Sequence, residues 1–237
     1  MKLYHGTSES VARVAIREGL WPRALTGGES LWERTVPSNS QLVYLTSSYP
    51  AYFAANASKE GERWAIIEVD TDLLDEDNLH PDEDAIEQST RRVERTGFDE
   101  LDAIPAGNMK ERTIWFRDHI ILFQGMWKES LAALGTVGYY GVIPPEAITR
   151  VSFYDPKSSP GLSLALMDTM VSLLNFQFCQ DRNKRMIEVL MGDSKDPAAL
   201  MIHPALGEMH PEIRQRAEEA ISAINIEILS GVAHACL

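Results

Sequence analysis

The chain has 237 residues, of which 44% are hydrophobic and 24% are charged, with a net charge of −13 and a pI near 4.9. This length and composition predict a globular chain with one large domain, or one domain with a helical extension; no run reaches the about 18 apolar residues of a membrane span. Without clustered Lys and Arg, the acidic balance argues against strong binding to duplex nucleic acid and favours a protein or small-molecule target.

The first 70 residues predict three strands and two helices, because β-branched and apolar runs alternate with capped, helix-periodic segments. Ser8 or Ser10 can cap the first helix, and Gly19 ends it. The expected strands are 2–7, 41–47 and 64–70, and the expected helices are 8–18 and 49–57.

Residues 71–112 are acidic, carry few large apolar residues and predict a surface excursion with a helix near 83–95. The apolar segment 113–124 fits a strand or a buried helix equally well. Further along the chain we expect a helix at 127–134, strands at 137–143 and 148–154, and helices at 161–178, 181–192 and 209–229. The pattern predicts an α+β fold with domain 1–157 and a helical C-terminal part, 158–237, which could bind a partner protein.

Cysteine and acidic motifs give no sign of a metal site. Two cysteines, Cys179 and Cys236, cannot build a zinc site or a disulfide framework, and no apolar run follows Lys2 as in a signal peptide, so we expect a cytoplasmic protein. The acids after Asp70 lack the glycine of a calcium loop. We expect the acids of 82–84 to cap the helix that follows them.

The run His5-Gly6-Thr7 ends the first predicted strand and is the strongest chemical signal in the chain. A histidine can donate to a ribose hydroxyl, a glycine lets a ligand approach the backbone, and a threonine supplies a hydroxyl. The three residues together suit a sugar or nucleotide better than a core. Tyr44, in the second strand beside Thr46, is either a core aromatic or a ring that stacks on a planar ligand.

These residues, taken together with the helix between them, resemble the ADP-ribosyltransferase superfamily on its diphtheria-toxin and poly-ADP-ribose-polymerase side. The resemblance covers roughly residues 1–155 and includes the exit Gly19-Leu20-Trp21-Pro22 and the small residues Ala51, Ala54 and Ala55. It implies split, mixed β-sheets with helices, and NAD as co-substrate. By this resemblance His5 binds the adenosine ribose, Tyr44 stacks on nicotinamide, and Gly6, Thr7 and Thr46 complete the binding residues.

The third catalytic residue of the family is a glutamate near a late strand, but Thr136 stands at the start of that strand here. Glu129 is the favoured candidate, and Gln124 and Glu146 are the alternatives. A carboxylate at this place would stabilise the oxocarbenium-like charge that develops when nicotinamide leaves the ribose. The chemistry requires no metal.

The resemblance implies a mono-ADP-ribosyltransferase with an unidentified acceptor, a protein being favoured, and short stand-alone members are often toxins or phage-conflict proteins. Because Thr136 replaces the expected acid, a degenerate module that binds NAD or ADP-ribose is a second reading. A partner-binding interaction protein is the third. A tRNA 2′-phosphotransferase also begins with His-Gly-Thr, but the basic residues it would use on phosphate are not found at matching positions.

Overall fold

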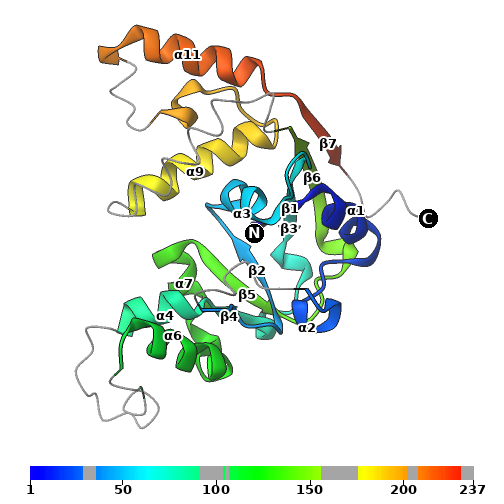
Figure 1. The fold of residues 1–237 in the computed structure, drawn as a ribbon, viewed down its shortest axis with the longest axis vertical. Coiled ribbons are helices and arrows are strands. Elements are labelled where there is room, and N and C mark those ends of the chain that lie inside the picture. The colour runs from blue at the N-terminus through cyan, green and yellow to red at the C-terminus, as the bar shows by residue number, and fades with distance from the viewer. Residues whose placement is uncertain (29–35, 91–103, 105–106, 156–175, 202–207, 231–237) are drawn as a thin grey trace. The chain divides into compact units, whose positions relative to one another are not determined.

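A computed structural model gives the fold, and it describes residues 1–28, 36–90, 104, 107–155, 176–201 and 208–230 (Figure 1). Contacts between the elements divide the chain into two compact units. Unit 1 comprises Met1–Gly19, Thr46–Leu73 and Pro144–Leu237, and unit 2 comprises Leu20–Leu45 and Leu74–Ile143. The chain therefore passes twice from unit 1 to unit 2 and back.

The described strands follow the hydrogen-bonded order β4-β5-β2-β1-β3-β6-β7, and each pairing of defined register is antiparallel. This arrangement, with helices in the C-terminal part, confirms the α+β class. Strand β2 (Leu42–Thr46) lies in unit 2 except for its last residue, Thr46, which pairs with Tyr4 in unit 1.

Unit 1 is a sheet with helices on both faces. Its other elements are β1 (Lys2–Ser8), α1 (Glu9–Glu18), α3 (Pro50–Ala57), β3 (Trp64–Asp70), η1 (Thr71–Leu73), η4 (Pro145–Ala147), β6 (Ile148–Tyr154), α9 (Phe176–Leu190), η6 (Pro197–Leu200), α11 (Pro211–Ser222) and β7 (Ile226–Ser230). Figure 1 shows α1 and α9 on opposite sides of β1, β3 and β6. Side chains alternate between the two faces of a strand, so His5 shares its face with Leu3 and Thr7, and Tyr4 shares the other with Gly6.

The core of unit 1 lies on the Tyr4 face, under α3 and α9. It contains Ala51, Ile66, Tyr154, Met186, Ile187, Val189, Leu190, Met191, Ala199 and Ile221, with Tyr4, Tyr52, Ala55, Trp64, Leu200 and Ile224 packed against them. The Ser152 hydroxyl, fully buried in β6, donates to the Leu190 carbonyl at 2.6 Å and ties the end of α9 to the sheet. On the other face, the guanidinium of Arg13 in α1 stacks 4.8 Å above the Phe153 ring.

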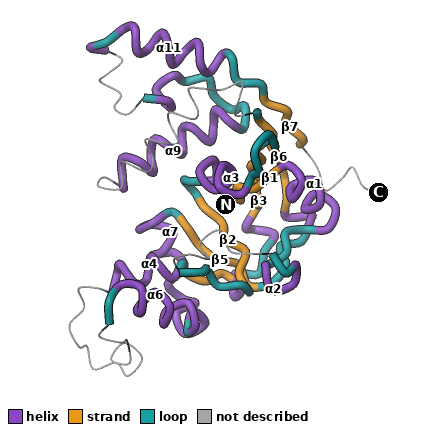
Figure 2. Tube along the Cα trace, viewed as in Figure 1, coloured by secondary structure: helices purple, strands orange, loops and turns teal. Residues whose placement is uncertain are grey.

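Unit 2 contains α2 (Arg23–Thr26), η2 (Glu76–Asn78), β4 (Leu79–Pro81), α4 (Glu83–Thr90), α6 (Met109–Asp118), η3 (Ile120–Met126), α7 (Trp127–Leu134) and β5 (Thr136–Tyr140), with most of β2. Figure 2 shows α4, α6 and α7 grouped beside β5. Its core contains Leu42, Ile86, Phe116, Ile120 and Phe123.

Most predicted elements of the first 155 residues are present where the structure describes them. Ser8 caps α1, accepting from the Val11 N–H at 3.5 Å, and Gly19 ends the helix at a positive φ of 84°. The ambiguous segment 113–124 is helical: Asn108 and Glu111 form a reciprocal capping box that starts α6, and this signal was missed.

Two predictions about unit 2 and the C-terminus were wrong in part. The described part of 71–112 is not only a surface excursion, because Leu79, Ala85 and Ile86 are buried in unit 2. The helix predicted at 209–229 ends at Ser222, and Ile226–Ser230 forms the strand β7 against β6. The helix predicted at 161–178 lies almost wholly outside the described residues. No described helix has the length and apolar character that a membrane crossing requires.

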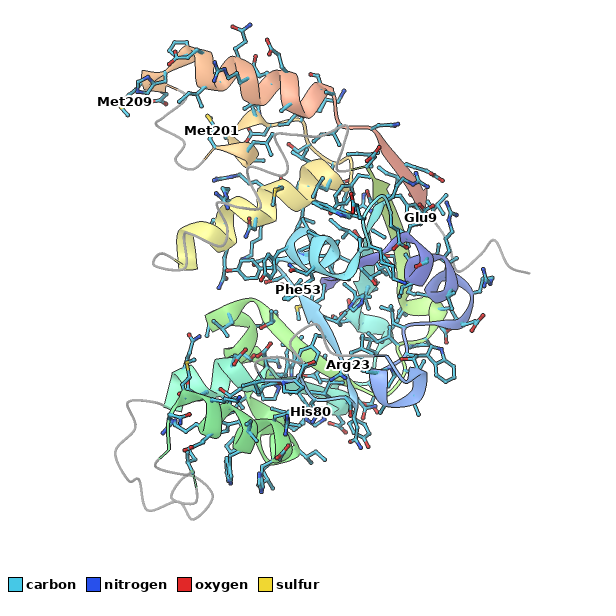
Figure 3. All side chains as sticks on the ribbon, viewed as in Figure 1. Glu9, Arg23, Phe53, His80, Met201 and Met209 are labelled. Carbon is cyan, nitrogen blue, oxygen red and sulfur yellow. The ribbon has the colours of Figure 1, made fainter. Side chains whose placement is uncertain are left out.

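An ion-pair network explains how β7 is held. The guanidinium of Arg63 contacts Glu9 at 2.6 Å and Glu227 at 2.7 Å, so it joins the start of α1 to the start of β7. Glu9, which Figure 3 labels, has a pKa lowered to about 2, first by its hydrogen bond from Arg63. The alternation of Ile226, Glu227 and Ile228 also suits a strand, and the edge of β6 offers backbone hydrogen bonds. Together these factors outweigh the helix propensity of the segment.

Candidate active site

His5 lies in the middle of β1, opposite Ile67 of β3, and its side chain is half-buried. Thr7, two residues on and on the same face, is buried. The strand therefore places the two predicted binding side chains on one face of the sheet of unit 1, as the alternation of a β-strand requires.

Gly6 faces the opposite way, toward α3. A Cβ at Gly6 would lie in hard contact with the Pro50 carbonyl oxygen and 2.7 Å from the Ala54 backbone nitrogen. Helix α3 can approach this closely because Ala51 and Ala54, both buried, present only methyl groups. Helix packing thus accounts for the glycine without a ligand, and the contact of Gly6 with NAD stays a prediction.

Thr46 has a structural role at the end of β2. Its side chain is 1% exposed, and its Oγ1 accepts the backbone N–H groups of Ser48 and Tyr49 at 3.0 Å each. This turn directs the chain into α3. A role for Thr46 in NAD binding also stays a prediction.

Tyr44 belongs to unit 2, where its ring packs against the cluster around Leu42 and Phe116. Its Oη donates to Glu83 Oε2 at 2.6 Å and accepts the Asn39 backbone N–H at 2.9 Å. Burial, followed by the nearby Glu83 charge, raises the pKa of Tyr44 well above its usual range, so the phenol remains neutral. The residue keeps part of its surface exposed although its hydroxyl is held at both sides.

Glu83 is the acid that the sequence did not single out for this site. It is 4% exposed, and burial first, then the neighbouring Asp82, raises its pKa to about 8. A detectable signal was the spacing of Glu83, Ile86 and Glu87, which places two acids and an apolar residue on one helix face. Glu87 is also buried and pairs with Arg112 of α6 at 3.3 Å.

Asp82 starts α4 and connects it to the rest of unit 2. Its Oδ1 accepts the Asp84 N–H at 2.9 Å, which confirms a capping role for this acid. Its own N–H donates to Ser130 Oγ at 2.9 Å, and that hydroxyl donates to the Thr136 carbonyl at 2.7 Å. The start of α4 is therefore tied to both α7 and β5.

The three candidates for the catalytic acid position lie in different settings. Glu129 is exposed in the first turn of α7, next to Ser130. Gln124 is half-buried and donates to the Glu76 carbonyl at 3.4 Å. Glu146 is exposed and belongs to unit 1. Unit 2 thus carries Tyr44 and Glu129, unit 1 carries His5, and the meeting of the three in one site stays a prediction.

Within the described ranges, no group of three or more His, Cys, Asp or Glu side chains is arranged to hold a metal ion. His80 of β4, labelled in Figure 3, is buried beside the Tyr140 ring, with ring centroids 6.1 Å apart. Burial lowers the pKa of His80 from its usual value, which favours the neutral imidazole.

The raised pKa of Glu83 predicts that stability falls as pH rises. In the unfolded chain Glu83 ionises above its ordinary pKa of 4.5, whereas in the folded chain its pKa is about 8. The protonated Glu83 therefore contributes its full stabilisation of the fold below pH 4.5, and this stabilisation is lost as the pH rises to about 8. Glu83→Gln is expected to flatten this decline and to raise the free energy of unfolding at pH 8 by ~2 kcal/mol. Urea titrations at pH 5 and pH 8 measure this, and an unchanged pH slope in the variant would contradict it.

Comparison with known proteins does not identify a family. No protein-family model and no curated protein matches the sequence. Among solved structures, the chain is similar to "EcPltA" at 12% sequence identity and a TM-score of 0.34, over 65% of this chain and 75% of that chain. This likeness is too weak to indicate an activity.

Proposed function

We propose that the protein is an NAD-dependent mono-ADP-ribosyltransferase. The observation that carries the proposal is the His5-Gly6-Thr7 run on a β-strand, with His5 half-buried and Thr7 on the same face. Capped helix α1 and strand β2 follow in the predicted order. A histidine and a hydroxyl on one face of a strand supply the donors that a ribose needs.

In the proposed reaction, a nucleophile of the acceptor attacks C1′ of the nicotinamide ribose. The bond from C1′ to the nicotinamide nitrogen breaks, and nicotinamide leaves with the bonding electron pair as a neutral molecule. The acceptor loses its proton to a nearby carboxylate or to water. His5 holds the adenosine ribose, Tyr44 stacks on nicotinamide, and Glu129 stabilises the developing positive charge on the sugar.

The test is incubation of the purified chain with labelled NAD and a cell lysate, with free nicotinamide and transferred label measured separately. We expect nicotinamide release and a labelled protein band. Labelled nucleic acid or a labelled small molecule in place of a protein would keep the transferase and change the acceptor. If NAD is neither bound nor cleaved, the proposal fails.

Glu129→Gln is expected to lower the rate of nicotinamide release on the order of 100-fold, because the amide cannot stabilise positive charge as a carboxylate does. Glu146→Gln is the matched control, since Glu146 is also an exposed glutamate near the late strand, and it should release nicotinamide at the wild-type rate. The reverse result for the two variants would move the catalytic acid to Glu146.

A second candidate is a module that binds NAD without cleaving it. Thr136, a buried threonine, occupies the start of β5, where the resemblance implies an acid, and this favours the second candidate. NAD binding by calorimetry with no release of nicotinamide over hours would support the module over the transferase.

A further inference from the structure

Tyr44 and Glu83 form a hydrogen-bonded pair in unit 2, and the Glu83 side of the pair is buried. The 2.6 Å distance between Tyr44 Oη and Glu83 Oε2 is that of a strong hydrogen bond. Both residues lie in unit 2, one on β2 and the other in the first turn of α4. The contact therefore joins a strand to a helix that begins 39 residues further along the chain.

A glutamate at this position is a costly choice for a core. Glu83 is 4% exposed, and its neighbour Asp82 adds a second carboxyl group beside it. A buried carboxyl group is tolerated only when hydrogen bonds satisfy it, and an apolar residue of similar size would fill the same space at lower cost. The Tyr44 hydroxyl supplies such a hydrogen bond to the Glu83 carboxyl group.

Two hydrogen bonds fix the Tyr44 hydroxyl from different sides. Glu83 accepts from it, and the backbone N–H of Asn39, in the segment before β2, donates to it at 2.9 Å. The Asn39 side chain in turn donates to the Arg117 carbonyl at 3.0 Å, so the segment is itself anchored to α6. Asp82 anchors the other side through Ser130 of α7. The ring is thus held at its far end by α4 and by the segment before β2, while the residue retains partial exposure.

We propose that Glu83 is a positioning residue, which holds the Tyr44 ring in the orientation that stacks on the nicotinamide ring of NAD. The inference rests on the proposed function, because it needs Tyr44 to contact NAD. Stacking requires one ring plane, and a ring that can turn or shift loses part of its binding energy to ordering. Glu83 touches no substrate atom and acts through Tyr44 alone.

The test is a double-mutant cycle on the full chain, with the NAD dissociation constant from calorimetry and the KM and kcat of nicotinamide release. We expect Tyr44→Phe and Glu83→Ala each to raise the dissociation constant and KM about fivefold to tenfold, with kcat within about twofold of wild type. The double variant should lose no more than either single variant. Glu83→Gln should recover most of the affinity, because its amide oxygen can still accept from Tyr44.

Glu87→Ala is the matched control, since Glu87 is a buried acid on the same face of α4 and pairs with Arg112 instead of Tyr44. It should lower the unfolding midpoint and leave KM unchanged. Additive losses in the double variant, or a wild-type KM in folded Glu83→Ala, would overturn the positioning role. If Glu83→Ala does not fold, Tyr44→Phe decides alone, and a wild-type KM there overturns it. A wild-type chain that does not bind NAD would instead refute the proposed function, and the inference with it.

Discussion

Gly6→Ala is expected to destabilise unit 1 by ~3 kcal/mol or more, the largest effect on stability that we predict. The added Cβ would meet the Pro50 carbonyl and the Ala54 backbone nitrogen, which belong to the backbone of α3. A flexible side chain could turn away, but a helix backbone must move as a whole. Separation of α3 from β1 would also open the contact of Ala51 with the core.

The measurement is the free energy of unfolding from denaturant titration, followed by circular dichroism. Gly125→Ala is the matched control, because a Cβ at Gly125 meets nothing within 4 Å and the residue has no positive φ. We expect the control to unfold within about 0.5 kcal/mol of wild type. A Gly6→Ala protein that is as stable as the control would show that α3 does not pack on β1 as described.

The same residue shows how far sequence reasoning reaches. The pattern around Gly6 correctly predicted a strand, a capped helix and a second strand, because hydrophobic periodicity and caps are local signals. The reason for the glycine could not be read locally. It depends on the backbone of α3, where Pro50 follows Gly6 by 44 positions, and no local pattern shows that α3 packs on β1.

The C-terminal strand β7 shows the limit of periodicity over longer distances. Residues 226–230 can follow either a helical or a strand pattern, and what decides is the edge of β6 away from β3, which offers backbone hydrogen bonds to a second antiparallel partner. The division into two units could not be predicted from the sequence either, because each unit combines segments that lie far apart in the chain. The chain leaves unit 1 at Leu20 and again at Leu74. The acidic composition of 71–112 begins near the second crossing, but it does not show that this segment joins the same unit as Leu20–Leu45.

The sequence predicted a residue of the candidate site only where its residue type and its immediate neighbours point to a function. His5 could be singled out because Gly and Thr follow it, a combination that suits a sugar or nucleotide, and the structure places it half-buried on β1. For Glu83 the spacing with Ile86 and Glu87 is visible in the sequence, but it does not name Tyr44 as the partner. Three consecutive acids before a helix indicate capping instead, and Asp82 does cap. The hydrogen bond from Tyr44 depends on the packing of β2 against α4, which is a tertiary contact.

His5→Ala is expected to lower kcat/KM for nicotinamide release on the order of 100-fold or more, the largest effect on activity that we predict. In the proposed reaction the loss has two parts, since the imidazole would both bind the adenosine ribose and fix the distance from it to the reacting sugar. Alanine leaves the backbone pairing of β1 with β3 intact, so the fold should persist. His5→Gln keeps a side-chain donor and should retain a larger share of the activity than alanine.

The assay compares His5→Ala with His210→Ala, which removes a histidine that is exposed in unit 1 and contacts Glu212 at 3.2 Å. His210→Ala should release nicotinamide at the wild-type rate. Both variants lose an imidazole side chain. A difference between their rates of nicotinamide release therefore depends on the position of His5 on β1, and not on the loss of a titratable group. Equal rates in both variants and wild type would remove His5 from the site, and the His-Gly-Thr run would then be part of the sheet alone.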